Sequence, residues 1–340
     1  MTIRKKKHVN LLFKPGDMKK SLPFLIFLIF LVIAIPAVRA QWIPSRGIDE
    51  ANVSDVTVLD STVFICTNGI WSRSINGGTW QERLPGISFR RMETCGDALF
   101  AWGTFTCYRS PDHGNTWQDM NIYWGMEARS MCIIDSTLFF STPYGIFRSD
   151  NLGNTVYPLM VDSSFIYPMV AGDGNSSLFW YKDYDCDYLF ESTDKGISWD
   201  TIPYTGLPSN FFVYDIARLD STLWLAANTG VYWRSDSQQQ WVLIQDTLGV
   251  SRLDILNGTL MACSWYKGVF RLDPANYQWF PENTGLETLS VNGICDFAGG
   301  LFLATDFGPY QCTTPYNWMP FYDGLNQASV DALAFLGNEV

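Results

Sequence analysis

A short polar turn followed by a run of apolar residues recurs along most of the chain. The first copy spans Leu59–Phe64 and reads Leu-Asp-Ser-Thr-Val-Phe. Equivalent turns are anchored at positions 60, 96, 135, 175, 220, 257, 298 and 337, with spacings of 36, 39, 40, 45, 37, 41 and 39 residues. A period near forty residues, with room for about four short strands, is typical of the blades of a β-propeller. The pattern therefore predicts an all-β fold.

Every repeat divides into four strands in the same way. In the first repeat, strands A to D span residues 53–59, 62–67, 69–73 and 80–84. Gly and β-branched residues interrupt every candidate helix, which leaves a solenoid of strands as the only other repeat architecture. We expect one domain over residues 41–340, a β-propeller of seven complete four-stranded antiparallel blades.

Both ends of the repeat region carry part of a further unit. Residues 41–44 correspond to residues 317–320, and residues 329–340 correspond to a strand A and the start of a strand B. The alternative to seven blades is therefore a ring of eight, closed by an incomplete eighth blade. In that case the reading frame is truncated. An eighth blade would leave a gap between the first and seventh units, whereas a seven-bladed ring would bring these two units into direct contact.

The N-terminal residues 1–40 indicate a targeting segment rather than part of the fold. An apolar run over residues 22–38 follows Lys19 and Lys20, and small residues stand where a signal peptidase would cleave before Gln41. We expect a signal peptide over residues 1–40. If translation begins at Met18, residues 1–17 are an upstream extension of the reading frame. A retained membrane anchor is the alternative, although 17 residues is the short limit for a span.

Export predicts a secreted, periplasmic or cell-surface protein with no membrane insertion after cleavage. Residues 1–40 hold eight of the 23 Lys and Arg and one of the 34 Asp and Glu, so residues 41–340 carry 15 basic and 33 acidic residues and a net charge of −18. This charge repels nucleic acid and anionic membrane surfaces, which excludes both as expected partners. Two His in the whole chain exclude a His-rich metal centre.

All eight Cys lie in the exported part of the chain. None of them forms a pair with metal-ligand spacing. Export permits disulfides, and buried thiols on strands are an equally good interpretation.

The turn between strands C and D carries the most specific motif. Two copies fit S-x-D-x-G-x-[ST]-W, and a third has Asn in place of Asp and Val in place of Trp. The motif residues are Ser110, Asp112, Gly114, Thr116 and Trp117, then Ser149, Asn151, Gly153 and Thr155, then Ser192, Asp194, Gly196, Ser198 and Trp199.

This motif resembles the Asp-box, the bacterial neuraminidase repeat of sialidases, sortilin-type receptors, xyloglucanases and photosystem assembly factors. The resemblance covers nearly all of residues 42–340 and implies a propeller in which the Asp-box is a structural hairpin. Asp and Ser side chains can bond the turn backbone, Gly can take positive φ, and Trp117 and Trp199 can pack as buried aromatics between blades. A residue repeated in several blades is expected to be scaffolding, because an active site occurs once.

The resemblance also implies a ligand face opposite the Asp-boxes, where the D–A and B–C connections surround a central channel. The candidate ligand-binding residues are Arg90, Arg91, Arg129, Tyr214, Asp215, Arg252, Trp124, Trp265 and Tyr266. An Arg cluster of this kind could form a site for an anion or a sugar carboxylate. The favoured interpretation is that these Arg residues pair with acids around the channel.

Catalytic machinery is not expected. The segment Phe89–Met92 lacks the Ile-Pro of the sialidase motif, and no Glu stands convincingly beside a Tyr. We expect no cofactor. The alternating Asp183, Asp185 and Asp187 imitate the start of a calcium loop, but Tyr188 occupies the position of its Gly, so a solvated hairpin is the favoured interpretation.

The sequence therefore predicts an exported, non-catalytic binding or scaffold module for a glycan or an extracellular protein. The alternative is a glycoside hydrolase, sialidase-like or xyloglucanase-like, that uses two carboxylates across the channel. Such an enzyme needs a carboxyl pair at one of two spacings, about 5 Å or about 6.5–9.5 Å. Channel acids that are each paired with an Arg would count against hydrolysis.

Overall fold

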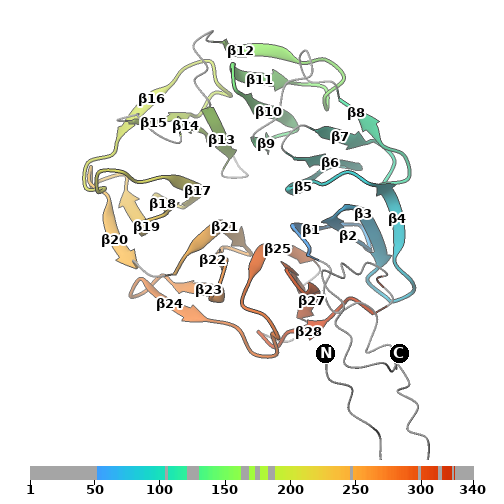
Figure 1. Cartoon of the computed structure of the whole chain (residues 1–340). Coiled ribbons are helices and arrows are strands. Elements are labelled where there is room, and N and C mark those ends of the chain that lie inside the picture. The colour runs from blue at the N-terminus through green and yellow to red at the C-terminus, as the bar shows by residue number, and fades with distance from the viewer. Residues whose placement is uncertain are drawn as a thin grey trace, which may run out of the picture. The chain divides into compact units, whose positions relative to one another are not determined.

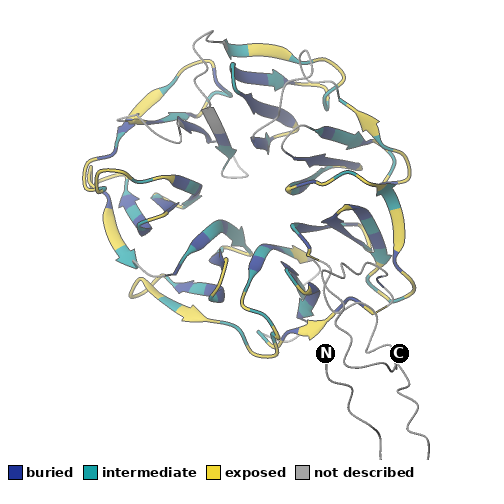
Figure 2. Cartoon of the chain, in the orientation of Figure 1, coloured by how far each residue is buried: buried dark blue, intermediate teal, exposed yellow. Residues whose placement is uncertain are grey.

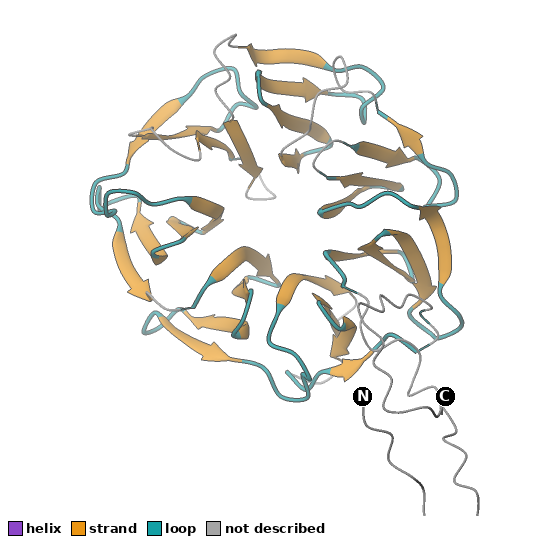
Figure 3. Ribbon diagram, in the orientation of Figure 1, coloured by secondary structure: helices purple, strands orange, loops and turns teal. Residues whose placement is uncertain are grey.

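Seven four-stranded antiparallel sheets make up the described part of the computed structural model. The structure describes residues 52–103, 106–120, 130–161, 168–172, 177–182, 188–245, 248–297, 300–312, 316–323 and 325, all within the unit Ser45–Val340. Each sheet consists of four strands that follow one another in sequence, and the sheets form a ring (Figure 1). The described residues are strands and loops only (Figure 3). The expected seven-bladed β-propeller is confirmed.

The strands follow the predicted A to D order in every blade. Blades 1 to 4 contain β1 (Asp55–Leu59), β2 (Thr62–Thr67), β3 (Gly69–Ser74), β4 (Gln81–Pro85), β5 (Arg91–Cys95), β6 (Ala98–Trp102), β7 (Cys107–Ser110), β8 (Gln118–Asp119), β9 (Ser130–Ile134), β10 (Thr137–Thr142), β11 (Gly145–Ser149), β12 (Tyr157–Val161), β13 (Pro168–Gly172), β14 (Leu178–Lys182), β15 (Tyr188–Ser192) and β16 (Asp200–Pro203). Blades 5 to 7 contain β17 (Val213–Leu219), β18 (Thr222–Ala227), β19 (Gly230–Ser235), β20 (Val242–Gln245), β21 (Val250–Leu256), β22 (Thr259–Ser264), β23 (Gly268–Asp273), β24 (Gln278–Pro281), β25 (Val291–Phe297), β26 (Gly300–Thr305), β27 (Gly308–Cys312) and β28 (Met319–Pro320).

The repeated polar anchors form the tight A–B turns. Asp60, Asp135, Asp220 and Asn257 each take a left-handed backbone conformation, with φ of 54°, 46°, 53° and 50°. Asp and Asn tolerate positive φ better than other side chains, which explains why these residue types recur at the anchor. The following B strands are buried along almost their whole length, because a neighbouring blade covers each of their faces (Figure 2).

Blade 7 closes the ring by packing directly on blade 1. The Val53 amide donates to Thr305 O at 2.9 Å. The Trp80 and Phe321 rings meet edge to face, with centroids 5.8 Å apart. These contacts exclude an eighth blade between the first and seventh sheets. Residues 41–44 and 329–340, which suggested that blade, lie outside the described residues, as does the predicted signal peptide.

Three C–D turns share one hydrogen-bond pattern. In blade 2, Ser110 Oγ donates to Asp112 Oδ1 at 2.9 Å and accepts the Gly114 amide at 2.8 Å. Asp112 also accepts the amide and the hydroxyl of Thr116, at 2.8 and 2.7 Å. These bonds from Thr116 lower the pKa of Asp112. The Asp112 carboxylate is thus hydrogen-bonded within its own turn.

The other two turns repeat this pattern with their own residues. In blade 4 the bonds from Ser198 lower the pKa of Asp194 to about 2. In blade 3, Asn151 Oδ1 accepts the Thr155 amide at 2.9 Å and Asn151 Nδ2 donates to the Thr155 hydroxyl at 2.9 Å. An amide therefore replaces the carboxylate without loss of the turn.

The Trp residues of these turns are less buried than the sequence motif suggests. Trp117 and Trp199 are only half-buried, although both pack against apolar clusters. The equivalent Trp80, Trp241 and Trp318, which belong to degenerate copies of the motif, are 6%, 1% and 2% exposed. The expectation of a fully buried aromatic was therefore wrong for the two best motif copies.

Candidate functional site

Strand A of every blade has one residue at an equivalent register position, and we call these seven positions the ring positions. In blade 1 it is Asp55, which pairs with Cys66 of strand B, and in every other blade it is the residue that pairs with the strand B residue equivalent to Cys66. These ring positions hold Asp55, Arg91, Ser130, Met169, Asp215, Arg252 and Gly293. Figure 1 shows that the strands that carry these positions, β1, β5, β9, β13, β17, β21 and β25, lie innermost in the ring.

The acidic ring residues accept backbone amides of the inner strands. Strand A is the inner edge of each sheet, so amides on its open side need acceptors other than a strand. Asp55 accepts the amides of Val56 and Met92, each at 2.9 Å. Asp215 accepts the Ile216 and Leu253 amides, each at 3.0 Å. Each carboxylate thereby links its own blade to the next one.

Ser130 has the same role between blades 3 and 4. Its hydroxyl accepts the Val170 amide at 2.8 Å and lies 2.6 Å from the Ser141 hydroxyl. The ring residues of blades 1, 3 and 5 therefore each bond an amide of the following blade.

The basic ring residues pair with acids of other blades. Arg252 Nη1 lies 2.6 Å from Asp55 Oδ1, and Arg252 Nε donates to Asp254 Oδ1 at 3.0 Å. Gly293 of the intervening blade leaves room for this pair, because a Cβ there would lie 2.4 Å from Asp55 Oδ1. Arg91 Nη2 of blade 2 lies 3.5 Å from Asp215 Oδ2 of blade 5. The pairing of Arg with channel acids, one of the two sequence interpretations, is thus present for Arg91 and Arg252.

A polar cavity of about 240 Å³ lies at this ring, and we call it the cup. Its charged lining residues are Arg90, Arg91, Glu93, Asp215, Arg252 and Asp254. Burial raises the pKa of Glu93 to about 7, although Arg252 and Arg91 oppose the shift. Burial likewise raises the pKa of Asp254 to about 6 against the opposing effect of Arg252. The cup therefore contains two carboxyl groups that titrate near neutral pH.

The exposed rings of Trp265 and Tyr266 and the partly buried ring of Tyr214 lie beside the cup, and we call these three residues the shelf. Tyr214 also lines the cup, and its ring meets that of Trp265 edge to face, with centroids 4.7 Å apart. Trp265 and Tyr266 are 43% and 58% exposed. They occupy the turn between β22 and β23, on the same face of the ring as the start of strand A.

The structure brings most of the predicted ligand residues together. Five of them line the cup: Arg90, Arg91, Tyr214, Asp215 and Arg252. Trp265 and Tyr266 lie on the shelf next to it. The remaining candidates, Arg129, Trp124 and the calcium candidates Asp183, Asp185 and Asp187, lie outside the described residues.

Sequence reasoning missed the acids Asp55, Glu93 and Asp254. A signal for the last two was present, because each follows a ring-position Arg by two residues and alternate residues of a strand share a face. Asp55 occupies the ring position itself and could have been found by aligning the strand A starts.

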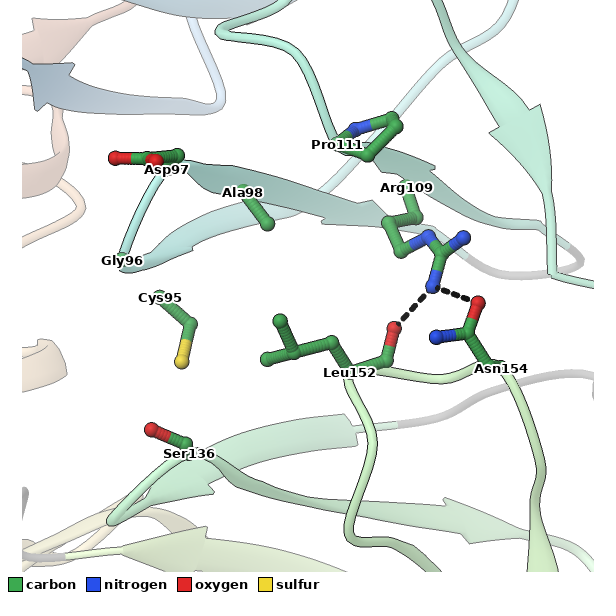
Figure 4. Close-up of a pocket in the computed structure, with 9 residues that line it drawn as sticks. All are labelled: Cys95, Gly96, Asp97, Ala98, Arg109, Pro111, Ser136, Leu152 and Asn154. Atoms are coloured by element: carbon green, nitrogen blue, oxygen red, sulfur yellow. Dashed lines mark hydrogen bonds between the residues drawn. The ribbon is translucent and has the colours of Figure 1, made fainter.

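A second hollow of about 520 Å³ lies between blades 2 and 3, beside the A–B and C–D turns (Figure 4). Arg109 Nη1 lies over it and donates to Leu152 O at 2.6 Å and to Asn154 Oδ1 at 2.8 Å. These bonds join the C strand of blade 2 to the C–D turn of blade 3. The Arg109 guanidinium is therefore used for contact between blades.

The described residues contain no cluster of three or more metal-ligating side chains and no helix long and apolar enough to cross a membrane. Cys66, Cys95, Cys107, Cys263 and Cys295 are thiols rather than disulfides. Burial raises the pKa of the Cys66, Cys107, Cys263 and Cys295 thiols. Of the two cysteine interpretations, the buried thiol applies to Cys66, Cys107 and Cys263, whereas Cys95 and Cys295 are partly exposed thiols.

Comparison with known proteins shows the fold class. No protein-family model matches the chain, and no curated protein matches it. The extracellular domain of the one component system BT4673 from B. thetaiotaomicron is similar, with a TM-score of 0.61 and 13% identity over 78% of this chain and 39% of that one. This chain therefore spans well under two thirds of that domain.

Two further solved structures share the architecture. YCF48 from Cyanidioschyzon merolae has a TM-score of 0.59 and 13% identity over 79% of this chain and 97% of that one. The GH74 xyloglucanase from Xanthomonas campestris has a TM-score of 0.60 and 13% identity over 84% of this chain and 54% of that one. At these identities the likeness shows the β-propeller fold alone, and that fold is shared by an extracellular domain and an enzyme.

Proposed function

We propose that this protein is an exported, non-catalytic β-propeller that binds a glycan or an extracellular protein at the shelf and the cup. One observation carries the proposal. The acids Asp55, Asp215 and Asp254 are held by Arg252, Arg91 or backbone amides, whereas the rings of Trp265 and Tyr266 stand exposed beside them. Acids that are bonded to the scaffold are poorly placed to act on a substrate, and exposed aromatics are typical anchors for ligands.

The comparisons support a binding role. One similar structure is the extracellular domain of BT4673, and another is YCF48 bound to the D1 peptide. Export itself rests on the signal peptide that we expect over residues 1–40. We also assign the three C–D turns to the Asp-box repeat, on the support of the hydrogen-bond pattern that they share.

Glycoside hydrolysis is the second candidate, and a specific observation favours it. Glu93 and Asp254 both line the cup, and both have a raised pKa, about 7 and about 6. A carboxyl group that titrates near neutral pH is suited to general acid catalysis. A xyloglucanase is also among the similar structures.

The two candidates are separated by testing binding and turnover on one preparation. The exported protein is applied to glycan and peptide arrays, and every ligand found is then incubated with it and assayed for new reducing ends. We expect binding without turnover. Trp265→Ala should weaken the binding, while Phe280→Ala should not, since Phe280 is similarly exposed at 41% but lies on the outer strand β24. Turnover that disappears in Glu93→Gln would establish the hydrolase instead.

Export has its own test. The N-terminal sequence of the protein recovered outside the cell should begin at Gln41. A sequence that begins at or before residue 18 would contradict cleavage.

A further inference from the structure

We infer that the shelf and the cup form one continuous site for a neutral sugar residue at the end of a glycan. This inference rests on the proposed binding function and narrows it to one chemical class of ligand. It differs from the acidic ligand that the Arg cluster suggests when the sequence is considered alone.

Continuity follows from the contacts of Tyr214. Its ring packs edge-on against Trp265 of the shelf, and its side chain also lines the cup. The next residue, Asp215, lines the cup as well and meets Arg91 from the opposite side of the ring at 3.5 Å. A ligand that stacks on Trp265 therefore lies within reach of the polar groups of the cup.

The shelf is held rigidly by its own turn. The Ser264 hydroxyl donates to Leu248 O at 2.5 Å and accepts the Lys267 amide at 3.0 Å. Gly249 makes room for the Tyr266 ring, because a Cβ there would lie 2.3 Å from Tyr266 Cζ. One side of the Tyr266 ring thus rests on backbone while more than half of the side chain stays exposed. A fixed aromatic surface of this kind can bury the apolar face of a sugar ring at low cost in conformational entropy.

The charge of the cup favours a neutral ligand. Among the described residues its lining holds three guanidinium groups and three carboxyl groups: Arg90, Arg91, Arg252, Glu93, Asp215 and Asp254. Sugar hydroxyls can donate to carboxylates and accept from guanidinium groups at once, so a polyol can use both signs. An anionic ligand would instead meet three carboxyl groups and a strongly acidic protein.

The size of the cup limits what enters it. Its volume of about 240 Å³ lies below the ~300 Å³ at which pockets for drug-sized ligands begin. The cup can therefore receive one residue of a glycan, while the rest of the chain lies along the exposed face.

Calorimetric titration of the exported protein tests the inference. The probes are cellohexaose, mannohexaose and xylohexaose as neutral ligands and hexagalacturonate as the acidic one, each at about 50 mM and about 500 mM NaCl. We expect at least one neutral probe to bind with a Kd that changes less than about twofold between the two salt concentrations. Trp265→Ala and Tyr266→Ala should each raise that Kd about tenfold or more, and Phe280→Ala should leave it unchanged.

Three results would overturn the inference: binding of hexagalacturonate alone, neutral binding that does not depend on Trp265, or no neutral binding up to about 5 mM. Failure of the proposed binding function can be distinguished from failure of the sugar assignment. If peptides on the array bind through Trp265 while no neutral probe does, the binding role stands and the sugar assignment is wrong. If nothing on either array binds, both are wrong.

Discussion

At the level of single residues, the inner edge of the propeller explains which side chains stand at its centre. The open side of strand A needs hydrogen-bond acceptors, and Asp55, Ser130 and Asp215 supply them. The carboxylates then need positive charge, which Arg252 and Arg91 bring from blades 6 and 2. The result is a charged network that holds several blades together and also lines the candidate site.

Glu93 should make stability depend on pH. Its pKa in the folded protein, about 7, lies above its ordinary value of 4.5, so the folded state keeps a proton that the unfolded chain releases. The stability that Glu93 contributes is therefore fully present below about pH 4.5 and is lost as the pH rises through about 7. Glu93→Gln should become more stable than the natural protein as the pH rises over that range, measured as the urea midpoint.

Glu82→Gln is the control for this experiment. Glu82 is an exposed acid of β4, and its replacement should leave the pH profile unchanged. Parallel profiles for the natural protein and Glu93→Gln would contradict the assigned pKa.

The Trp residues at the start of strand D should differ in their effect on stability. Trp241 is 1% exposed and its indole donates to Pro203 O at 3.2 Å, so Trp241→Ala should cost about 3–5 kcal/mol. Trp117 is half-buried, so Trp117→Ala should cost about 1–2 kcal/mol. Urea unfolding of the two variants measures the difference, and equal costs would contradict it.

At the level of elements, the C–D turns of blades 2, 3 and 4 contact the preceding blade as well as connecting two strands. Gly114 has φ of +78°, and a Cβ at this residue would lie 2.4 Å from the Phe64 ring of blade 1. A Cβ at Gly153 would lie 2.1 Å from Met120 Cε, and one at Gly196 would lie 2.4 Å from Leu159 Cδ2, both in the preceding blade. The glycine of the motif therefore serves both the turn and the packing between blades.

Replacing these glycines separates the two roles. Gly258 has a similar φ of +73° but open space around it, so Gly258→Ala carries backbone strain alone, about 1–2 kcal/mol. Gly114→Ala adds a clash with Phe64 and should cost about 1–3 kcal/mol more. The free energies of unfolding of the two variants give the comparison. Equal losses of unfolding free energy would show that the turn at Gly114 does not pack closely against blade 1.

At the level of the whole molecule, the ring of described strands closes through side chains and a few backbone bonds. Every sheet takes its four strands from one continuous stretch, so no described strand is exchanged between blades 1 and 7. Arg73 of blade 1 donates to the carbonyls of Phe321 and Asp323, each at 3.2 Å, and its guanidinium lies 4.6 Å from the Phe321 ring centroid. Arg73 therefore adds polar contacts to a junction of blades 1 and 7 that is otherwise packed by apolar side chains.

Arg73→Ala should loosen this junction selectively. Loss of two hydrogen bonds and of the contact with Phe321 should speed hydrogen exchange in β1 and β28, while β17 to β20 stay protected. Arg271→Ala is the matched control, because Arg271 also lies over aromatic rings but pairs with Glu282 inside blade 6. Faster exchange throughout the ring in Arg73→Ala would mean that the molecule opens as one unit.

The candidate site was only partly predictable. Arg91 and Arg252 were recognised because charged residues at strand starts are conspicuous in a sequence. Their partners were not, because Arg252 and Asp55 stand 197 positions apart and meet only when blade 7 carries Gly293 between them. Burial, which sets the pKa of Glu93 and Asp254, likewise depends on the neighbouring blades.

The sequence by itself determined the features that depend on neighbours along the chain. The Asp and Asn of the A–B turns, the apolar B strands and the Ser-x-Asp-x-Gly turns all act within a few residues, so their recurrence revealed the blade and its period. The tertiary structure decided the features that depend on ring closure. Direct packing of blade 7 on blade 1 set the number of blades. The same closure paired Arg91 with Asp215 and Arg252 with Asp55, because only a closed ring brings blades 1, 2, 5 and 6 together at its centre.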